Sequence, residues 1–177
     1  MTSVIRILHS GDLDAPTLRV IRSLLDEAFE GEFSDHDWDH GLGGTHALVI
    51  VDGVLVAHGS LVQRRVLHAG RSLRTGYVEA VAVRPVRRRS GHATEVMTAL
   101  ESLRRGYDLL ALSSSEDGVA LYVSRGWQRW RGPSSVLTPS GIEPTPGDDG
   151  SVYVLPGATP LDLDGEITCD WREGDVW

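Results

Sequence analysis

Apolar residues near the start of the chain follow first a strand pattern and then a helix pattern. A short apolar cluster at residues 4–8 predicts a first strand. Apolar side chains then recur every three or four residues over 18–28, which predicts an amphipathic helix with Pro16 near its start. Ser34 is placed to cap a short second helix that runs through Trp38 and ends near Gly41.

Two glycine-containing dipeptides divide the next stretch into three strands. Residues 46–51 and 54–65 are rich in β-forming side chains, and Asp52-Gly53 between them is a strong hairpin signal. A second turn at Ala69-Gly70 leads into another apolar stretch, 73–83. The pattern predicts a three-stranded antiparallel meander.

The apolar period changes again in the second half of the chain. Apolar residues over 93–103 share one face of a helix that begins near Gly91. The run 109–112 predicts a buried strand that lies parallel to its neighbour. A short helix is predicted over 119–125, stopped by Gly126 at the usual cap position.

The C-terminal region is harder to interpret from its pattern. Residues 133–150 are rich in Pro, Gly and Ser and predict a loop, followed by a final strand over 152–155. The tail 169–177 carries two tryptophans, which is unusual for a flexible end. The order of elements predicts an α/β (α+β) fold with a mixed central sheet flanked by helices, in a single domain over 1–177.

Composition narrows the class of protein. The chain has 177 residues, a net charge of −8 and one cysteine, Cys169, which excludes an internal disulfide. The negative charge argues against nucleic acid as the main partner and would favour cationic ligands, although by itself the charge is better explained by solubility alone. No apolar run is long enough for a signal peptide or a membrane span, so we expect a cytoplasmic protein without a membrane partner.

The stretch Arg88-Arg89-Ser90-Gly91-His92-Ala93 joins the end of a strand to the start of a helix. Backbone N–H groups at a helix start have no intrahelical partners, and the helix dipole adds positive charge there. Small residues at 91 and 93 leave room for a diphosphate, and the arginines surround it. The same features also fit a solvated basic turn. The glycine pattern matches neither a Walker loop nor a dinucleotide fingerprint.

The stretch 88–93 and a second segment further along the chain resemble motifs of a known family. Residues 88–93 fit the Arg/Gln-x-x-Gly-x-Gly/Ala motif of the GNAT acetyltransferases, after a strand that ends Val-Ala-Val-Arg-Pro. Residues 120–127, Ala-Leu-Tyr-Val-Ser-Arg-Gly-Trp, look like that family's second segment. The resemblance implies the GNAT acyl-CoA N-acyltransferase fold and acetyl-CoA as the acetyl donor.

Further segments are similar to the aminoglycoside 2′-N-acetyltransferases. They include Phe-Glu-Gly-Glu-Phe at 29–33, Gly-Tyr-Val-Glu at 76–79, Leu-Ser-Ser-Ser at 112–115 and the closing Cys-Asp-Trp-Arg-Glu-Gly-Asp-Val-Trp at 169–177. This likeness covers nearly the whole chain. It implies acetylation of the 2′ amine of an aminoglycoside by direct transfer, and a homodimer.

The resemblance also assigns roles in donor binding and chemistry. Coenzyme A would contact, through the backbone above all, Val81, Ala82, Val83, Arg88, Arg89, Ser90, Gly91, His92 and Ala93. Glu79 would accept the proton of the attacking amine, and Tyr122 would protonate the leaving thiolate. Strand alternation puts Glu79 on the same face as Val81, whose N–H would stabilise the thioester oxygen. Without the resemblance, Glu79 is also readable as an exposed strand residue and Tyr122 as a packed aromatic.

Carboxylates are the natural partners of a polyamine acceptor. The family's pattern carries over to Glu32, Asp37, Glu79, Ala80, Ser113, Asp148, Asp175 and Trp177, the last through its terminal carboxylate. Glu32 stands where the family has aspartate. On its own, the loop around Asp148 would be read as a surface turn.

One further motif has a competing interpretation. His36-Asp37-Trp38-Asp39-His40 has the two-histidine spacing of a metalloprotease helix. The predicted helix is short and no third ligand follows, so we assign the stretch to substrate binding or helix capping and predict no metal.

Two other functions remain open at this point. The chain could acetylate another small amine or a peptide N-terminus, with drug acetylation incidental. It could also be a catalytically silent acyl-CoA-binding domain, although the presence of both Glu79 and Tyr122 argues against that.

Overall fold

The computed structural model describes residues 3–177, which form two compact units. Unit 1 consists of the described residues up to Val62 together with Val78–Leu103. Unit 2 consists of Gln63–Tyr77 and Arg104–Trp177. The chain passes between the units three times, within the long strands β3 and β4 and again after Leu103.

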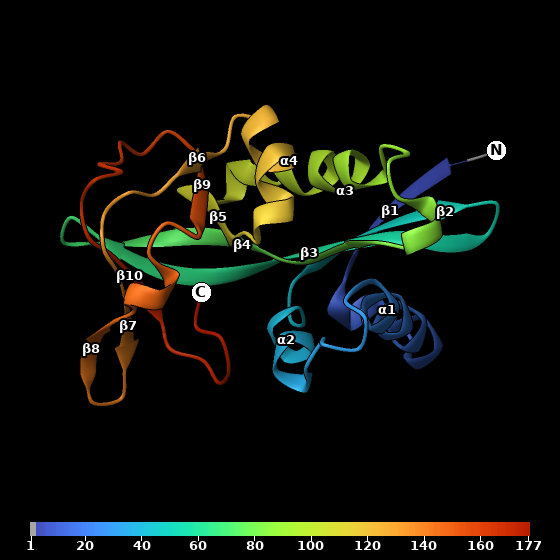
Figure 1. The fold of residues 1–177 in the computed structure, drawn as a ribbon, viewed down its shortest axis with the longest axis horizontal. Coiled ribbons are helices and arrows are strands. Elements are labelled where there is room, and N and C mark those ends of the chain that lie inside the picture. Colours follow the sequence, from blue (N-terminus) through green and yellow to red (C-terminus); the bar gives the residue numbers. More distant parts are fainter. Residues whose placement is uncertain (1–2) are drawn as a thin grey trace. The chain divides into compact units, whose positions relative to one another are not determined.

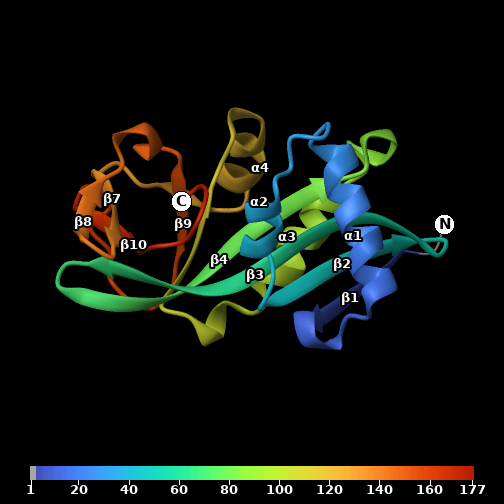
Figure 2. The ribbon, with the colours of Figure 1, turned by 90° about the horizontal axis from the view of Figure 1, so that it is seen from below.

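Unit 1 combines an antiparallel sheet with three helices. Its elements are β1 (Ser3–His9), α1 (Ala15–Ala28), α2 (Asp35–His40), β2 (Thr45–Val51), the first part of β3 (Val54–His68), the last part of β4 (Arg71–Val83) and α3 (His92–Glu101). One-turn 3-10 helices occur at Ser10–Asp12 and Pro85–Arg87. The strand order is β1-β2-β3-β4. In Figures 1 and 2, α1 and α2 lie on one face of these strands and α3 on the other.

The first helix begins and packs as its sequence predicts. The Asp14 carboxylate accepts a hydrogen bond from the Thr17 N–H at 2.9 Å, and Pro16 occupies the first turn. Its apolar face, with Ile21, Leu24 and Leu25 fully buried, joins a core that also contains residues of β2 and β3. Burial of this stripe against the sheet is what stabilises α1.

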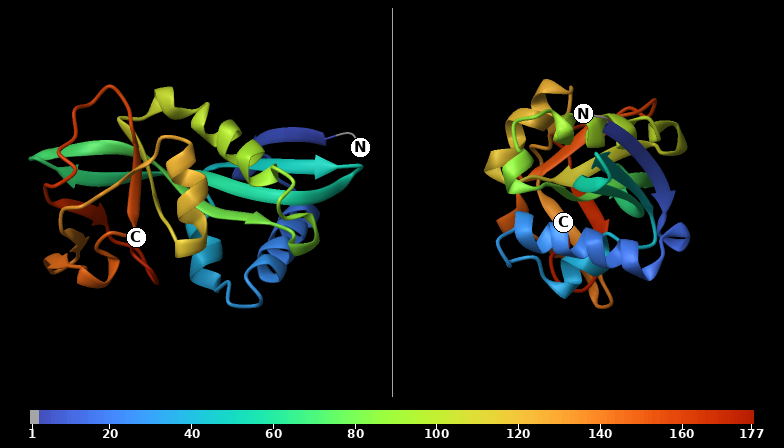
Figure 3. Two further views of the ribbon diagram at one scale, coloured as in Figure 1. Left: turned by 45° about the horizontal axis from the view of Figure 1, so that its top comes forward. Right: turned by 90° about the vertical axis from the view of Figure 1, so that its right-hand side faces the viewer.

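Both predicted hairpin turns are confirmed. Asp52 and Gly53 have φ values of 48° and 81°, and Ala69 and Gly70 have values of 48° and 72°. Positive φ at both central residues is the geometry that matches the twist of antiparallel strands. Figure 3 (left) shows the hairpin between β2 and β3, whose turn belongs to unit 1, and the hairpin between β3 and β4, whose turn belongs to unit 2.

Unit 2 adds shorter strands to the other parts of β3 and β4. Its further elements are β5 (Leu109–Ser113), α4 (Val119–Ser124), β6 (Gln128–Arg129), β7 (Ser134–Thr138), β8 (Gly141–Pro144), β9 (Val152–Pro156) and β10 (Ile167–Asp170). One-turn helices occur at Arg104–Gly106, Glu116–Gly118 and Pro146–Asp148. The order is β6-β9-β5-β4-β3-β10-β7-β8. The predicted parallel strand is confirmed, because β5 runs parallel to β4.

Two predictions for the C-terminal region are wrong. Residues 133–150 are not simply a loop, because they contain the antiparallel hairpin of β7 and β8. The strand β9 is not the last one, because β10 follows it and pairs in parallel with β7. The buried serine at 135 meets Thr168 at 2.7 Å between hydroxyl oxygens, so its polarity is satisfied inside the sheet. A serine-rich segment therefore forms the strand β7, whose first three residues are buried, whereas β8 is mostly exposed.

The observed fold confirms the mixed α/β class. Helices α2, α3 and α4, the short strand β1 and the meander occur where the patterns predict them, with ends shifted by a few residues. Within residues 3–177, the helices are too short or too polar to cross a membrane. The prediction of a single domain stays a prediction.

Candidate functional site

The last part of β4 carries a backbone irregularity beside the predicted base. Ala80 has a φ of 51°, a left-handed conformation that costs an alanine about 1 kcal/mol. Regular two-residue alternation therefore does not continue from Glu79 to Val81. The expectation that these two side chains share a strand face does not hold, because the left-handed residue between them redirects the chain.

Beyond this kink, the backbone of β4 regains a regular direction. The Arg84 N–H donates to the Val56 carbonyl of β3 at 2.9 Å. Alternate residues of a strand direct their N–H and C=O groups to opposite edges, so Val81 and Val83 direct theirs away from β3. In the described part of unit 1, β3 is the only strand beside β4. These backbone groups are thus placed to pair with an extended ligand.

The loop before α3 has two left-handed residues, Arg89 with φ 60° and Gly91 with φ 82°. Gly91 is the N-cap of α3 and supplies no side-chain cap, so the first-turn N–H groups from His92 onward are available to a ligand. Ser90 and both arginines beside it are exposed. Arg88 is braced through a 2.9 Å bond from its guanidinium to the Ala28 carbonyl. Positively charged side chains and uncapped backbone N–H groups are thus found together at this turn.

The predicted acceptor residues of unit 1 lie around α2. One carboxylate oxygen of Asp37 accepts bonds from the backbone N–H and the hydroxyl of Ser34, both at 2.8 Å, which completes a capping box. The capping interpretation is therefore confirmed for Asp37. Glu32 is exposed on the loop before this helix. That loop is held by Arg22, which donates to the Phe33 carbonyl at 3.1 Å and pairs with Asp35 at 2.9 Å.

Helix α2 ends against the kink in β4. A Cβ atom added at Gly41 would lie 3.2 Å from the Ser60 hydroxyl and 3.9 Å from the Ala80 Cβ. Gly41 is buried, and a glycine allows this close approach. Within unit 1, Glu79 and Ala80 thus lie next to the helix that carries Asp37.

In unit 2, Tyr122 is a buried side chain of α4. Burial raises the pKa of its hydroxyl to about 12, so the phenol keeps its proton at neutral pH. The ring packs closely over Gly118, where an added Cβ would approach Tyr122 Cε2 to 2.9 Å. Its centroid is 6.0 Å from that of Trp127. The packed-aromatic interpretation therefore holds alongside any chemical role.

Predicted acceptor residues of unit 2 gather around the turn Pro146–Asp148. The Ser113 hydroxyl donates to that of Ser151 at 3.1 Å, and Ser151 donates to the Asp148 carbonyl at 2.8 Å. Partial burial raises the pKa of the Asp148 carboxyl, and repulsion from Asp175 and Asp149 adds to the effect. Two mutually repelling carboxylates are suited to a ligand that carries several positive charges.

The C-terminal tail is fixed to the same turn. The Trp177 indole donates to the Thr145 hydroxyl at 3.0 Å, and the side chain is only 5% exposed. Arg172 donates to the Asp175 carbonyl at 2.8 Å, and the Cys169 thiol donates to the Val176 carbonyl at 3.4 Å. The structure thus brings together Ser113, Asp148, Asp175 and Trp177, as the resemblance implies.

Cys169 is poorly suited to carry an acyl group. Burial raises the pKa of its thiol to about 11, so the nucleophilic thiolate is rare at neutral pH. The thiol lies in β10, surrounded by the tail that it helps to hold.

Some residues that hold the predicted acceptor residues of unit 2 in place were not identified in the sequence. The Asp149 carboxylate accepts bonds from the Ser134 N–H and hydroxyl, both at 2.8 Å. The Ser134 hydroxyl also meets that of Thr145 at 2.7 Å. These bonds tie β7 to the turn that carries Asp148. The sequence signal for them is weak, because Ser, Thr and Asp are ordinary loop residues.

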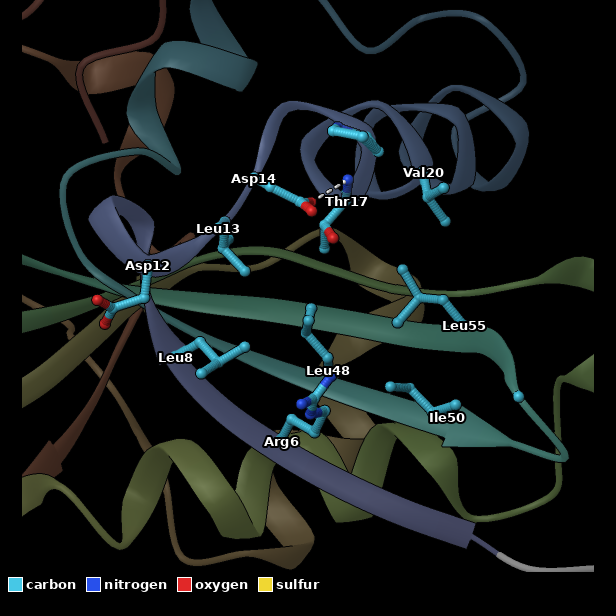
Figure 4. A pocket seen from close by; sticks show the side chains of 12 residues that line it. Arg6, Leu8, Asp12, Leu13, Asp14, Thr17, Val20, Leu48, Ile50 and Leu55 are labelled. Atoms are coloured by element: carbon cyan, nitrogen blue, oxygen red, sulfur yellow. Dashed lines mark hydrogen bonds between the residues drawn. The ribbon is translucent and has the colours of Figure 1, made fainter.

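Two other features do not coincide with the predicted site. Among residues 3–177, no group of three or more His, Cys, Asp or Glu side chains is arranged to hold a metal ion. A hollow of about 460 Å³ lies between α1 and the strands β1 to β3 (Figure 4). Its walls are largely aliphatic, with Leu8, Leu48 and Leu55 from the sheet and Val20 from the helix.

Comparisons with known proteins agree on the family. Residues 13–130 match the model of the acetyltransferase (GNAT) domain. An aminoglycoside 2′-N-acetyltransferase of Mycolicibacterium fortuitum is 52% identical, over 97% of this chain and 91% of the relative. A GNAT family acetyltransferase of Brucella melitensis, solved with acetyl-CoA, has a TM-score of 0.60 at 15% identity, over 93% of this chain and 94% of its own.

A longer solved protein shares the fold over part of its length. The GCN5-related N-acetyltransferase of Kribbella flavida has a TM-score of 0.57 at 18% identity, with 75% of this chain covered. This chain spans about a third, 34%, of that protein. The family model covers more than half of the sequence, and the relative at 52% identity covers nearly all of it. This chain therefore belongs to the GNAT acetyltransferase family.

Proposed function

We propose that this protein transfers the acetyl group of acetyl-CoA to the 2′ amine of aminoglycoside antibiotics and so confers resistance to them. The observation that carries the substrate class is the cluster of Ser113, Asp148, Asp175 and Trp177 around one turn of unit 2. Hydroxyl and carboxylate groups gathered around one turn are suited to a polyamine, which carries several positive charges. The 52% identical relative named for this activity supports the proposal.

The donor binds to unit 1 in this proposal. Its diphosphate rests on the backbone between Arg88 and Ala93, where helix N–H groups and arginines provide positive charge. Its pantetheine arm extends along Val81 and Val83, whose backbone groups point away from β3. The Val81 N–H then stabilises negative charge on the thioester oxygen as the amine attacks.

Two side chains move protons in the proposed reaction. Glu79 accepts a proton from the attacking amine, because only a neutral amine has a lone pair for the carbonyl carbon. The new C–N bond forms a tetrahedral intermediate, and its collapse breaks the C–S bond. Tyr122, which burial keeps protonated, donates a proton to the departing thiolate. The products are the amide and free coenzyme A.

A direct experiment tests this function. The enzyme is incubated with acetyl-CoA and a neamine-type compound, and mass spectrometry and NMR identify the product. We expect one added acetyl group, on the 2′ nitrogen. Acetylation at another nitrogen would contradict the proposed 2′ regiochemistry. Acetylation only of unrelated amines or peptide N-termini would contradict the proposed substrate class. Absence of thiol release with every amine would leave only an acyl-CoA-binding role.

A homodimer in the cytoplasm is part of the same proposal. The support for the dimer is the family resemblance of the sequence. Sedimentation equilibrium measures the mass in solution, and cell fractionation locates the protein. A monomer at micromolar concentration, or recovery outside the cytoplasm, would contradict these two points without affecting the chemistry.

A further inference from the structure

Two buried histidines and the half-buried Ser10 form, in unit 1, a hydrogen-bonded chain that the proposed mechanism does not use. The Ser10 hydroxyl lies 2.7 Å from His46 Nε2, and His46 Nδ1 lies 2.9 Å from His58 Nε2. His58 Nδ1 lies 2.9 Å from the carbonyl oxygen of Ala80. Both histidines are only 1% exposed. The chain therefore runs from the end of β1 to the kink in β4.

The partners determine where each proton lies. A carbonyl oxygen only accepts, so His58 Nδ1 carries a hydrogen and donates it to Ala80. In a neutral ring the other nitrogen is then an acceptor, so His46 Nδ1 donates to His58 Nε2. By the same reasoning His46 Nε2 accepts from the Ser10 hydroxyl, whose oxygen in turn accepts from the Gly43 N–H at 3.0 Å. Every bond of the chain points toward Ala80.

Both rings are neutral at physiological pH. Burial lowers the pKa of His46 to about 4, and burial together with its neighbour lowers that of His58 to about 3. A carbonyl oxygen ends the chain, and a peptide carbonyl does not pass on a proton. The chain is thus no route for the proton of the amine, and its role is to hold a position.

The contacts of β3 converge on the kinked segment. Beside His58, an added Cβ at Gly59 would lie 3.3 Å from Val81 Cγ2, and the Ser60 hydroxyl donates to the Glu79 carbonyl at 3.4 Å. Consecutive residues of β3 thus contact consecutive residues of β4. The left-handed conformation of Ala80 is unfavourable for alanine by itself, so surrounding contacts must maintain it.

We propose that His58, oriented by His46 and Ser10, is a positioning residue for acetyl transfer. By holding the Ala80 carbonyl it maintains the left-handed turn that sets the direction of the Glu79 side chain and the Val81 N–H. The inference rests on the proposed roles of Glu79 and Val81. It adds a residue that contacts neither substrate and acts instead through the backbone of Ala80, between Glu79 and Val81.

Paired variants test the proposal. His58→Leu removes the donor to Ala80, whereas His58→Asn keeps an N–H donor near the position of Nδ1. His68 provides the matched control, because it is also a buried histidine of β3 whose Nδ1 donates to a backbone carbonyl, that of Glu166, at 2.9 Å. That carbonyl lies in a segment, 157–166, without predicted site residues.

We expect His58→Leu to lower kcat roughly 10- to 100-fold, with KM for acetyl-CoA close to that of the wild type. His58→Asn should restore most of kcat. His68→Leu should lower the melting temperature by a similar amount and keep kcat. A folded His58→Leu enzyme with wild-type kcat, or an equal loss of kcat in His68→Leu, would overturn the positioning role.

A measurement on the wild-type protein tests the hydrogen-bonded chain without relying on a variant or on activity. If His58→Leu does not fold, or if the wild type acetylates no polyamine, ¹⁵N NMR of the histidine rings still decides. Both His46 and His58 should be in the Nδ1–H form and stay neutral at pH 6. An Nε2–H form of His58 would overturn the inference, whatever the substrate is. Wild-type inactivity alone would count against the proposed function and not against the hydrogen-bonded chain.

Discussion

The two units hold their predicted site residues by different physical means. In unit 1, the kink at Ala80 is held by neutral hydrogen bonds from His58 and from Ser60, both buried. In unit 2, hydroxyl groups and the C-terminal tail hold a turn whose carboxylates, Asp148 and Asp175, stay partly or fully exposed. Neutral hydrogen-bonding groups thus hold the backbone of unit 1 rigid, whereas the charged carboxylates of unit 2 stay accessible to a ligand.

The difference follows from the two ligands that we propose. A thioester oxygen gains charge only during the reaction, so it needs a correctly oriented N–H dipole that is rigid beforehand. Buried charges there would carry a large desolvation cost. A polyamine is charged before it binds, so carboxylates that remain hydrated until then attract it without that cost.

The largest effect is expected at Glu79. Glu79→Gln should lower kcat roughly 10²- to 10⁴-fold near neutral pH, because the amine loses the group that takes its proton. The loss should shrink at high pH, where more of the acceptor is already unprotonated. Turnover measured from pH 6 to 9 checks this. If the variant keeps the wild-type pH profile, Glu79 is not the base, and the kink at Ala80 does not serve to orient a base.

Acid should destabilise unit 1 through the two buried histidines. Their pKa values are depressed from 6.5 to about 4 for His46 and about 3 for His58, so the unfolded chain binds more protons between these values. The free energy of unfolding is therefore unaffected by these two groups above pH 6.5. It falls as the pH drops toward 4, by a total on the order of a few kcal/mol. Thermal melts at pH 7.5 and 5 measure it.

The variant His58→Asn sharpens this test. It removes one of the two groups, so the difference in melting temperature between the two pH values should be smaller than in the wild type. Asp164, paired with Arg131, has a lowered pKa and its contribution is lost only below pH 3.8, outside this window. An unchanged pH dependence in His58→Asn would mean that the histidine does not titrate as its burial implies.

A smaller effect is expected for the carboxylates of unit 2. Asp148→Asn should raise the acceptor KM roughly 10-fold, because one charge-assisted contact to an ammonium group is lost, while KM for acetyl-CoA stays the same. Asp164→Asn is the matched control, since it removes the same charge from an exposed pair outside the cluster. Equal effects of the two variants would reduce the role of Asp148 to that of general surface charge.

The smallest effect is expected for the arginines before α3. Arg88→Gln combined with Arg89→Gln should weaken coenzyme A binding up to about 10-fold, because most of the affinity comes from backbone N–H groups. Isothermal titration calorimetry measures it. The exposed pair Arg104 and Arg105, changed in the same way, is the control. Loss of all affinity would show that the charge of the arginine side chains contributes more than the backbone N–H groups.

Local sequence determined the hairpin turns and several helix ends. The turns Asp52-Gly53 and Ala69-Gly70, the start of α1 near Pro16 and the cap of α2 at Ser34 were all predicted from neighbouring residues. In each case the stabilising contact spans only a few positions, so the information is contained in a short window. The residues of the candidate site were instead identified from the family resemblance, and their roles in binding and catalysis stay predictions.

Tertiary structure decided the remainder, because those contacts join distant residues. The strand β10 forms by pairing with β7 and β3, and nothing in residues 167–170 alone requires a strand. Ala80 has no intrinsic preference for a left-handed φ, and the chain that holds its carbonyl begins seventy positions earlier at Ser10. The grouping of Ser113 with Asp148 and Trp177 likewise depends on the fold. Short-range patterns specify helices, turns and caps, whereas long-range hydrogen bonds specify where the backbone bends and which loops meet.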